Sequence, residues 1–526
     1  MTLNMKKIAY IACSMLLLAG ASACSDWMDI QQHGTLTPEN FYQTDEDASA
    51  AVAAAYASLA NLEFYHRTIN GYMSDEFWQN LNDHGGNLHE FFEYTGYYYG
   101  ANDQYIRELF TGLYNLVGKC NLVLEYVKGD SRFQQQAIAE ARVLRSMAYF
   151  ELTTLWETPP VVDHILSADE AAQPNGDPAR LWKLMEDDLK AAIESNSLTQ
   201  KASLEDRSNY RVTRQFAQAL LGKVYLWQGK NSEAAAVLDQ VIGSGLYALV
   251  RPSEIPYGDI PQSQYNNNKE SMFESNFVLD KDNNTFRLIA PSCGLCVYTR
   301  SGYDERSGEA NILNLYYNTW GGFSPRSGVY EAFVAEEGVD GYRLSQTIKT
   351  YDYMASQGYS MKADQQEFSE GFFMWKGRYM TSDADMTATL LPNLFRNFCW
   401  MRYAEVLLMA AEANIGIDQG KADKYLKEVR DRVGLPAKTC DLAAIKTERR
   451  LELFGESVRF KDLLRWGDAE TVLADFGKEE PVLTAAGLSW KNFSTTYGFK
   501  SKHKHLPFPE AEVLANRNLN QHSDWE

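Results

Sequence analysis

Flat aromatic rings with polar neighbours are the residues of this sequence whose types and spacing best suit a chemical task. The 526-residue chain contains 31 Tyr, 25 Phe and 11 Trp, and several of them lie in segments without helical periodicity. A sugar has an apolar C–H face that a ring can cover, and a rim of hydroxyl groups that amide, carboxylate and guanidinium groups can bind. Such rings therefore indicate a carbohydrate-binding surface.

Five aromatic and two polar positions meet this description. Trp78 is followed by several amide and acidic side chains, and Trp320 lies two residues after Asn318 and directly before a Gly pair. Packing of a loop onto a scaffold is the simpler role for any single ring, but we expect at least two rings to line a binding surface. The predicted ligand-binding residues are Trp78, Asn80, Tyr303, Arg306, Tyr316, Trp320 and Trp375.

Enzyme motifs are missing from the sequence. It contains no Walker A loop, no HExxH and no GxSxG. Residues 280–291 begin like a calcium loop, but Thr285 stands in place of the required Gly and Pro291 in place of the final Glu. Asp75 and Glu76 could be catalytic carboxylates, although a solvated or capping pair is the expected role. We therefore predict no catalytic residue, no cofactor and no metal.

The N-terminus reads as a lipoprotein signal. Lys6 and Lys7 precede an apolar run over 8–18, and small residues over 19–23 lead to Cys24. That run is shorter than the roughly 20 residues that cross a bilayer, so residues 1–23 are predicted to be a cleaved signal peptide. The segment over 21–24 resembles a bacterial lipobox, which implies that Cys24 is lipidated. The alternative is an ordinary signal peptide whose cleavage site lies beside a Cys.

Charge and cysteine content exclude further classes of protein. The formal net charge is −20, and cleavage removes Lys6 and Lys7 but no acid, so the mature chain carries about −22. Nucleic acid and anionic lipid surfaces bind basic patches, so neither is an expected ligand. Cys293 and Cys296 form a lone CxxC that lacks two further zinc ligands, which leaves a local disulfide or two free thiols.

The elements that must position these residues are mainly helices. Apolar residues recur at helical spacing over 45–59, 105–127, 134–156, 181–193, 212–227 and 232–242, and again over 401–415, 422–433, 442–454 and 458–466. The pair 212–227 and 232–242 resembles a tetratricopeptide hairpin, in which small residues allow two helices to approach closely. The predicted fold is mainly α, a tetratricopeptide-like scaffold with a loop-rich insertion and a few short strands.

We expect one domain over 24–526, in three parts. Residues 24–244 form an N-terminal helical part, 245–400 a loop-rich ligand-binding part and 401–526 a C-terminal helical part. The middle part is dense in Gly, Pro, Asn and aromatic residues, and long irregular segments are usually functional. Strands are predicted over 271–278 and 286–289, and the tail over 505–521 is predicted to be loop and short turn.

These features together resemble the SusD/RagB family of Bacteroidetes outer-membrane lipoproteins. One of the similar segments is Lys269-Glu270-Ser271-Met272-Phe273-Glu274. The order and spacing of all the segments together make the resemblance specific. The similar segments lie at 24–30, 34–42, 47–56, 141–150, 269–274, 402–405, 411–413, 429–432, 448–456, 506–510 and 516–520.

The resemblance implies a cell-surface protein anchored in the outer membrane by lipid at Cys24. It would cover a TonB-dependent, SusC-like transporter and deliver a captured glycan to it. Asp26 and Asp29 resemble the acidic stretch associated with surface export, and Trp320 lies in a segment similar to the family's middle region. Three alternatives remain open: a peptide-binding RagB-like protein, a glycoside hydrolase, and a tetratricopeptide scaffold that binds no small ligand.

Charged residues recur in the C-terminal part, and we expect them to stabilise the fold. Such groups commonly form ion pairs or helix caps that hold helices together. We predict this role rather than catalysis for Arg402, Glu405, Glu448, Arg449, Glu452 and Arg459.

Overall fold

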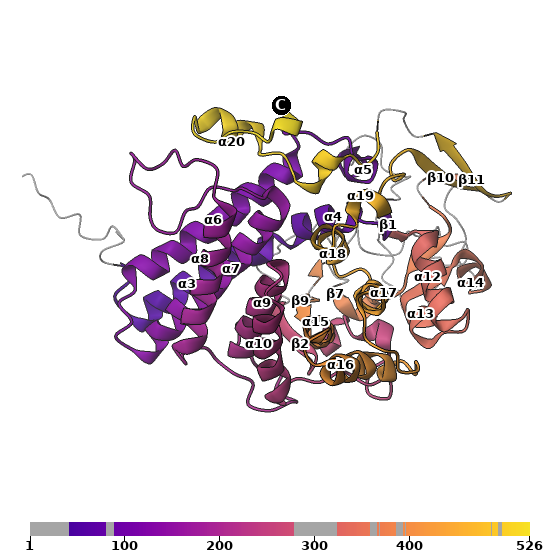
Figure 1. Cartoon of the computed structure of the whole chain (residues 1–526), viewed down its shortest axis with the longest axis horizontal. Coiled ribbons are helices and arrows are strands. Elements are labelled where there is room, and N and C mark those ends of the chain that lie inside the picture. The colour runs from indigo at the N-terminus through magenta and orange to yellow at the C-terminus, as the bar shows by residue number, and fades with distance from the viewer. Residues whose placement is uncertain are drawn as a thin grey trace, which may run out of the picture.

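Antiparallel helices form the N-terminal part of the protein (Figure 1). The computed structural model describes residues 41–79, 89–277, 323–357, 365–367, 369–385, 393–394, 396–484, 486–492 and 497–526. The helices of this part are α3 (Asp45–Asn61), α4 (Glu63–Tyr72), α5 (His89–Gly96), α6 (Gln104–Tyr126), α7 (Arg132–Trp156), α8 (Pro178–Glu194), α9 (Arg214–Trp227) and α10 (Asn231–Gly243).

Side-chain caps set where several of these helices begin. Thr44 accepts a hydrogen bond from the backbone N–H of Asp47, and the Asp47 carboxylate accepts one from the backbone N–H of Thr44. This capping box satisfies backbone groups that the first turn of α3 leaves unpaired. At α7 the Ser131 side chain accepts a hydrogen bond from the backbone N–H of Gln134, and Asp177 caps α8 just before Pro178.

The C-terminal helices continue the stack of the N-terminal ones. Helix α10 packs on α15, and α15 packs on α16, so the two parts are neighbours in space (Figure 1). The predicted tetratricopeptide-like scaffold is confirmed as a mainly helical fold. The C-terminal helices are α15 (Tyr403–Asn414), α16 (Gln419–Arg432), α17 (Leu442–Glu452), α18 (Arg459–Arg465), α19 (Ala469–Val472) and α20 (Glu510–Ala515).

Two paired strands mark where the middle part leaves and rejoins the helices. Strand β2 (Ser271–Ser275) pairs antiparallel with β9 (Phe398–Arg402). The chain between them contains short helices and short strands. The sequence did not predict most of them, because its hydrophobic periodicity is weak in this part. They are α12 (Ser327–Glu337), α13 (Tyr342–Thr347), α14 (Tyr351–Ser356), β3 (Ser324–Pro325), β4 (Ile348–Thr350), β5 (Gln365–Glu367), β6 (Phe372–Met374), β7 (Ala384–Asp385) and β8 (Asn393–Leu394).

The structure corrects two local predictions and adds one hairpin. Met401 and Arg402 end strand β9 rather than begin a helix, because they pair with β2. The tail contains α20, and the hairpin of β10 (Glu479–Thr484) and β11 (Gly487–Asn492) was not predicted. The strand expected over 271–278 is confirmed over 271–275, and the one expected over 286–289 lies outside the described residues.

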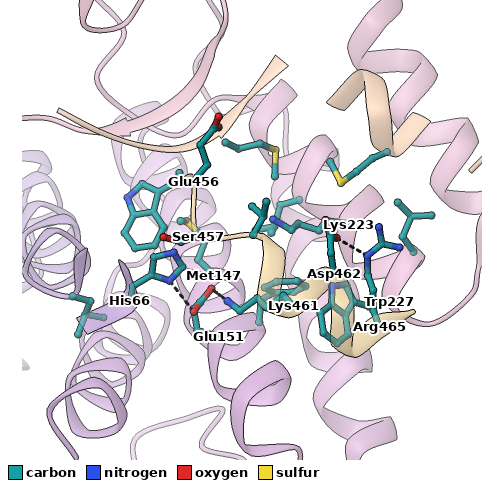
Figure 2. A pocket seen from close by; sticks show the side chains of 18 of the residues that line it. His66, Met147, Glu151, Lys223, Trp227, Glu456, Ser457, Lys461, Asp462 and Arg465 are labelled. Carbon is teal, nitrogen blue, oxygen red and sulfur yellow. Dashed lines mark hydrogen bonds and ion pairs between the residues drawn. The ribbon is translucent and has the colours of Figure 1, made fainter. Parts of the chain in front are cut away.

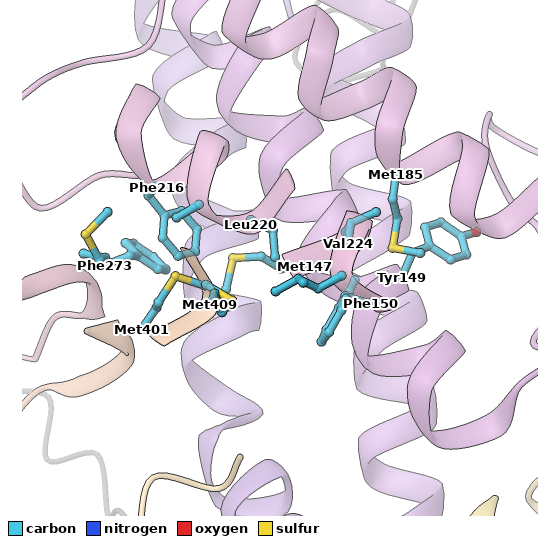
Figure 3. Close-up of a cluster of buried hydrophobic side chains, with 14 of the residues drawn as sticks. Met147, Tyr149, Phe150, Met185, Phe216, Leu220, Val224, Phe273, Met401 and Met409 are labelled. Carbon is cyan, nitrogen blue, oxygen red and sulfur yellow. The ribbon is translucent and has the colours of Figure 1, made fainter. Parts of the chain in front are cut away.

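A shared hydrophobic core joins the N- and C-terminal parts (Figure 3). Met147 and Phe150 of α7 lie near Leu220 of α9, and this cluster continues to Met401 of β9 and Met409 of α15. Burial of these side chains stabilises the fold by roughly 1.5–3 kcal/mol each. The N-terminal and C-terminal helices therefore share one hydrophobic core.

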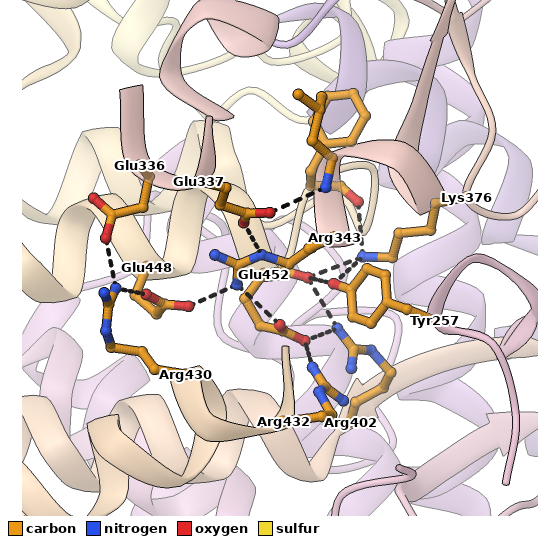
Figure 4. A network of polar contacts seen from close by, with 12 residues as sticks. Tyr257, Glu336, Glu337, Arg343, Lys376, Arg402, Arg430, Arg432, Glu448 and Glu452 are labelled. Atoms are coloured by element: carbon orange, nitrogen blue, oxygen red, sulfur yellow. Dashed lines mark hydrogen bonds and ion pairs between the residues drawn. The ribbon is translucent and has the colours of Figure 1, made fainter. Parts of the chain in front are cut away.

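The predicted ion pairs are confirmed (Figure 4). Arg343 is fully buried and contacts Glu337 and Glu448 at 2.6 Å each and Glu452 at 3.2 Å. Arg402 also reaches Glu452, at 3.1 Å. Further buried pairs join Arg449 to Glu405 and Asp462, Arg459 to Asp75, and Arg432 to Glu270.

Candidate functional site

Trp78 is buried and firmly held in the structure. It ends strand β1 (Phe77–Trp78), which pairs with β3. Its indole Nε1–H donates a 2.6 Å hydrogen bond to Glu370, and the guanidinium carbon of Arg326 lies 3.5 Å from the ring centroid. Trp78 is 4% exposed. The ring is therefore anchored on more than one side.

Arg326 connects this ring to the rest of the fold. Its backbone N–H donates to the carbonyl of Glu76 at 2.9 Å, and its Nε–H donates to the carbonyl of Phe77 at 3.0 Å. Its guanidinium carbon also lies 4.3 Å from the Phe476 ring centroid. Burial lowers the pKa of Arg326 to about 10, so it still carries its charge at neutral pH.

Trp375 lies in a different environment. It follows β6 and is 7% exposed, with the guanidinium carbon of Arg378 at 4.2 Å from its ring centroid. Tyr353 contacts it edge-on at 6.1 Å, and Lys349 lies 5.3 Å from the ring. No contact that brings Trp375 to Trp78 occurs among the described residues. The ligand-binding role of both rings stays a prediction.

The remaining predicted site residues lie outside the described part of the chain. They are Asn80, Tyr303, Arg306, Tyr316 and Trp320, together with the lipidation residue Cys24. Cys293 and Cys296 lie outside it as well. Of the cysteines within it, Cys120, Cys399 and Cys440 carry free thiols.

An exposed ring that sequence reasoning missed lies beside Trp78. Trp490 of β11 is 48% exposed, and its ring centroid lies 6.1 Å from that of Trp78 at an interplanar angle of 59°. Strand β11 is short and all its residues are exposed, so its sequence does not alternate between apolar and polar residues in the way that predicts a half-buried strand. The one feature of this segment that could have suggested a binding role was Trp490 itself.

A second pair of partly exposed rings lies at the end of the molecule that holds Trp78 and Trp490. Tyr98 and Tyr497 stack with centroids 4.1 Å apart, at 20° between their planes. The backbone N–H of Gly498 donates to the carbonyl of Gly96 at 2.8 Å, which brings these two distant segments together. In Figure 1, α5, β1, α19 and β10 lie in this region.

Asp75 and Glu76 are buried, which corrects the expected solvated or capping pair. Asp75 forms ion pairs with Arg459 at 2.7 Å and Arg450 at 2.8 Å. Burial alone would raise its pKa, but the two guanidinium groups outweigh that effect and lower it. Burial, followed by repulsion from Asp75, raises the pKa of Glu76 to about 8. The tertiary contacts of both carboxyl groups give them a structural role.

Two interior cavities are too small for a sugar. The first, of about 60 Å³, contains His66, Glu151 and Lys461 (Figure 2). His66 hydrogen-bonds Glu151 at 3.0 Å, and Lys461 also pairs with that carboxylate. The second cavity is about 80 Å³. Small-molecule sites generally measure roughly 300–1,000 Å³, so neither of these two cavities could enclose a sugar ligand.

A third hollow is large enough but has fewer rings. It measures about 370 Å³ and lies at the N-terminal ends of α3 and α7, where its lining includes Phe133 and Arg211. Ser49 and Glu140 already bind Arg211, at 3.4 Å and 2.8 Å. Within the described ranges, no group of His, Cys, Asp and Glu side chains is arranged to hold a metal ion.

Comparison with known proteins identifies the class. The sequence model of the SusD family matches residues 260–525, and a second model, described as starch-binding and associating with the outer membrane, matches residues 26–226. The chain belongs to the SusD family.

Named relatives extend over nearly the whole chain. It is 23% identical to SusD-like protein P2 of Formosa agariphila, over 98% of both chains. It is 24% identical to a SusD-like protein of Bacteroides ovatus, over 98% of this chain and 97% of the relative.

Solved structures show the same fold. A laminarin-binding SusD-like protein superposes with a TM-score of 0.73 at 25% identity, over 92% of this chain and all of the other. Surface glycan-binding protein A of Bacteroides thetaiotaomicron, in complex with laminarihexaose, gives 0.72 at 25% identity over 91% and 99%. In the described part of this chain, none of the helices combines the length and apolar character that crossing a membrane requires.

Proposed function

We propose that this chain is a lipid-anchored outer-membrane protein that captures an oligosaccharide or polysaccharide at the cell surface. It passes the glycan unchanged to a TonB-dependent, SusC-like transporter. Family membership and the family description that mentions the outer membrane support the location. The laminarin ligands named for two structural relatives support the class of ligand.

One observation on this chain carries the proposal. Partly exposed rings, Trp490 and the Tyr98–Tyr497 pair, gather at the end of the molecule that also holds Trp78. Rings can stack on the C–H face of a sugar without chemistry, which suits capture and release. The small volumes of the interior cavities favour this open arrangement over the closed, charged cavity that a peptide ligand would need.

A glycan array on the mature protein tests the class of ligand. We expect binding to one neutral glycan or more, with laminarin as the first probe, and weaker binding by Trp78→Ala and Trp320→Ala. Calorimetry with the best glycan then gives the affinity. Unchanged binding in both variants would refute the predicted site, and release of shorter sugars from the bound glycan would refute capture without chemistry.

The anchor needs a separate test. Cys24→Ala should remove the acceptor for lipid, so the protein should leave the membrane fraction of the native host, whereas Cys120→Ala should stay in it. Metabolic labelling with a clickable fatty acid gives a direct readout. Labelling that persists in Cys24→Ala would contradict the proposed lipidation.

A further inference from the structure

Trp490 lies on an edge strand that leaves it open to solvent. The sheet order is β11–β10–β5, so β11 has one described neighbour, β10. Every residue of β11 is exposed. In the antiparallel register Trp490 lies opposite Pro481, and its side chain is 48% exposed. Figure 1 shows the hairpin projecting from the body of the protein.

The surroundings of Trp490 fit a sugar better than a protein surface. Asn492, two residues on, places an amide on the same face of the strand as Trp490. Ser489 and Lys491 lie on the opposite face, where Ser489 donates to the carbonyl of Val482 and Lys491 pairs with Glu480. The exposed large apolar side chains of the hairpin are Leu488 and Trp490. A stable protein interface needs roughly 800 Å² from each partner, far more than two side chains provide. One open ring with an amide beside it is sufficient to stack on a pyranose.

Trp78 is the support behind this ring. It reaches Trp490 at 6.1 Å, while Glu370 holds its indole N–H and Arg326 covers its ring. At 4% exposed, Trp78 has almost no surface to offer a ligand. An indole on an exposed edge strand would otherwise sample several rotamers, and restricting them before binding lowers the entropic cost of binding.

We infer that Trp490 is the ring that contacts the glycan and that Trp78 is a positioning residue that holds it in place. This inference rests on the proposed function and assigns part of its site. It differs from the sequence-based prediction, in which Trp78 itself stacks on sugar.

Loss of the exposed ring is the first test. For the glycan that binds best on the array, Trp490→Ala should weaken the affinity measured by calorimetry about tenfold or more, equivalent to about 1.4 kcal/mol. Phe133→Ala, which removes another exposed ring far along the chain, should leave it unchanged. Phe133 is 67% exposed and Trp490 48%, so both variants should fold and should melt close to the wild type.

A double-mutant cycle separates positioning from contact. Trp78→Phe should weaken binding about three- to tenfold on the wild-type background, and should have no further effect on Trp490→Ala, because its action passes through Trp490. In protein labelled with 5-fluorotryptophan, the Trp490 resonance should shift on adding glycan. Trp78→Phe should shift or broaden that resonance before any glycan is added, which general destabilisation would not do selectively.

Each outcome decides between distinct conclusions. If the wild type binds a glycan and Trp490→Ala binds it equally well, the inference is wrong but the proposed function stands. Additive losses in the cycle would make Trp78 a direct contact. A change in sedimentation of Trp490→Ala with unchanged glycan binding would assign the ring to contact between copies of the chain. If the wild type binds no glycan, the proposed function itself fails.

Discussion

Asp75 and Glu76 are adjacent, buried and yet in opposite electrostatic situations. Two guanidinium groups hold Asp75 in its charged form, at 2.7 Å and 2.8 Å. Glu76 has the backbone N–H of Gly455 at 3.4 Å from its Oε2, and its Oε1 is buried without a partner. A carboxyl group in such a place favours its neutral form.

Glu76 should make the stability of the protein depend on pH. Its folded-state pKa of about 8 lies above the unfolded value near 4.5, so its contribution is fully present at low pH and is lost as the pH rises towards 8. For Glu76→Gln we expect a flatter profile of unfolding free energy, with a relative gain of up to about 4 kcal/mol between about pH 5 and pH 8.5.

Urea unfolding at a series of pH values measures this effect. Asp75→Asn is a second probe of the same pair. It leaves Arg450 and Arg459 without their carboxylate, so it should destabilise the protein, and it removes the charge that helps raise the pKa of Glu76, so it should also flatten part of the profile. Parallel profiles for the wild type and Glu76→Gln would show that Glu76 is ionised in the folded protein at neutral pH.

Arg343 should be indispensable for stability. Three carboxylates surround this fully buried guanidinium group. Arg343→Met would remove the cation that pairs with Glu337 and one of the cations that pair with Glu448 and Glu452, at a cost of about 3–5 kcal/mol. Arg180→Ala breaks an exposed pair with Asp163 and should cost under about 1 kcal/mol. Chemical denaturation compares the two variants, and similar losses would argue against the network in Figure 4 as a main stabiliser.

At the scale of elements, the hairpin of α9 and α10 connects the N-terminal helices to α15. Gly222 permits the close contact between its two helices. A Cβ added there would lie 2.6 Å from Cδ2 of Leu238, well inside van der Waals contact. The small residue is thus a requirement of helix packing in the stack.

Gly222→Ala should loosen this hairpin. Overpacking should cost about 1–3 kcal/mol, even though Ala has the higher helix propensity. Gly243→Ala is the control at the end of α10, where no atom lies within 4 Å of the added Cβ, and it should be neutral or slightly stabilising. Melting temperatures of the two variants distinguish these effects. If Gly222→Ala is as stable as Gly243→Ala, then α9 and α10 can move slightly apart with no loss of folding free energy.

At the scale of the whole molecule, charge should limit which glycans bind. The formal net charge is −20, and such a field repels polyanions within about a Debye length of the surface. We expect the affinity for a neutral glucan such as laminarin to change little between about 20 and 200 mM NaCl.

Anionic polysaccharides should behave differently. Alginate and polygalacturonate should bind more weakly than laminarin at low salt and should gain affinity as salt rises. Affinity electrophoresis at several ionic strengths compares them. Tight binding of a polyuronate that weakens with added salt would show a basic binding surface and contradict this expectation.

Periodicity in the sequence was enough to predict most of the helical scaffold. The alanine-rich pattern over 45–59 and the pair 212–227 and 232–242 each correspond to a helix in the structure. A helix imposes its 3.6-residue repeat on its own side chains, so one local segment contains the whole signal. Charge, the N-terminal pattern and the abundance of rings are likewise properties of the chain itself.

Only the tertiary structure decided what each ring and charge does. Trp78 and Trp490 are 412 positions apart, and their contact depends on how β1 and the β10–β11 hairpin are brought together. Met401 and Arg402 look helical in sequence, but pairing with β2 makes them a strand. Asp75 is buried because Arg450 and Arg459 reach it from the C-terminal part. Burial and strand pairing are set by contacts between distant segments, which local periodicity does not encode.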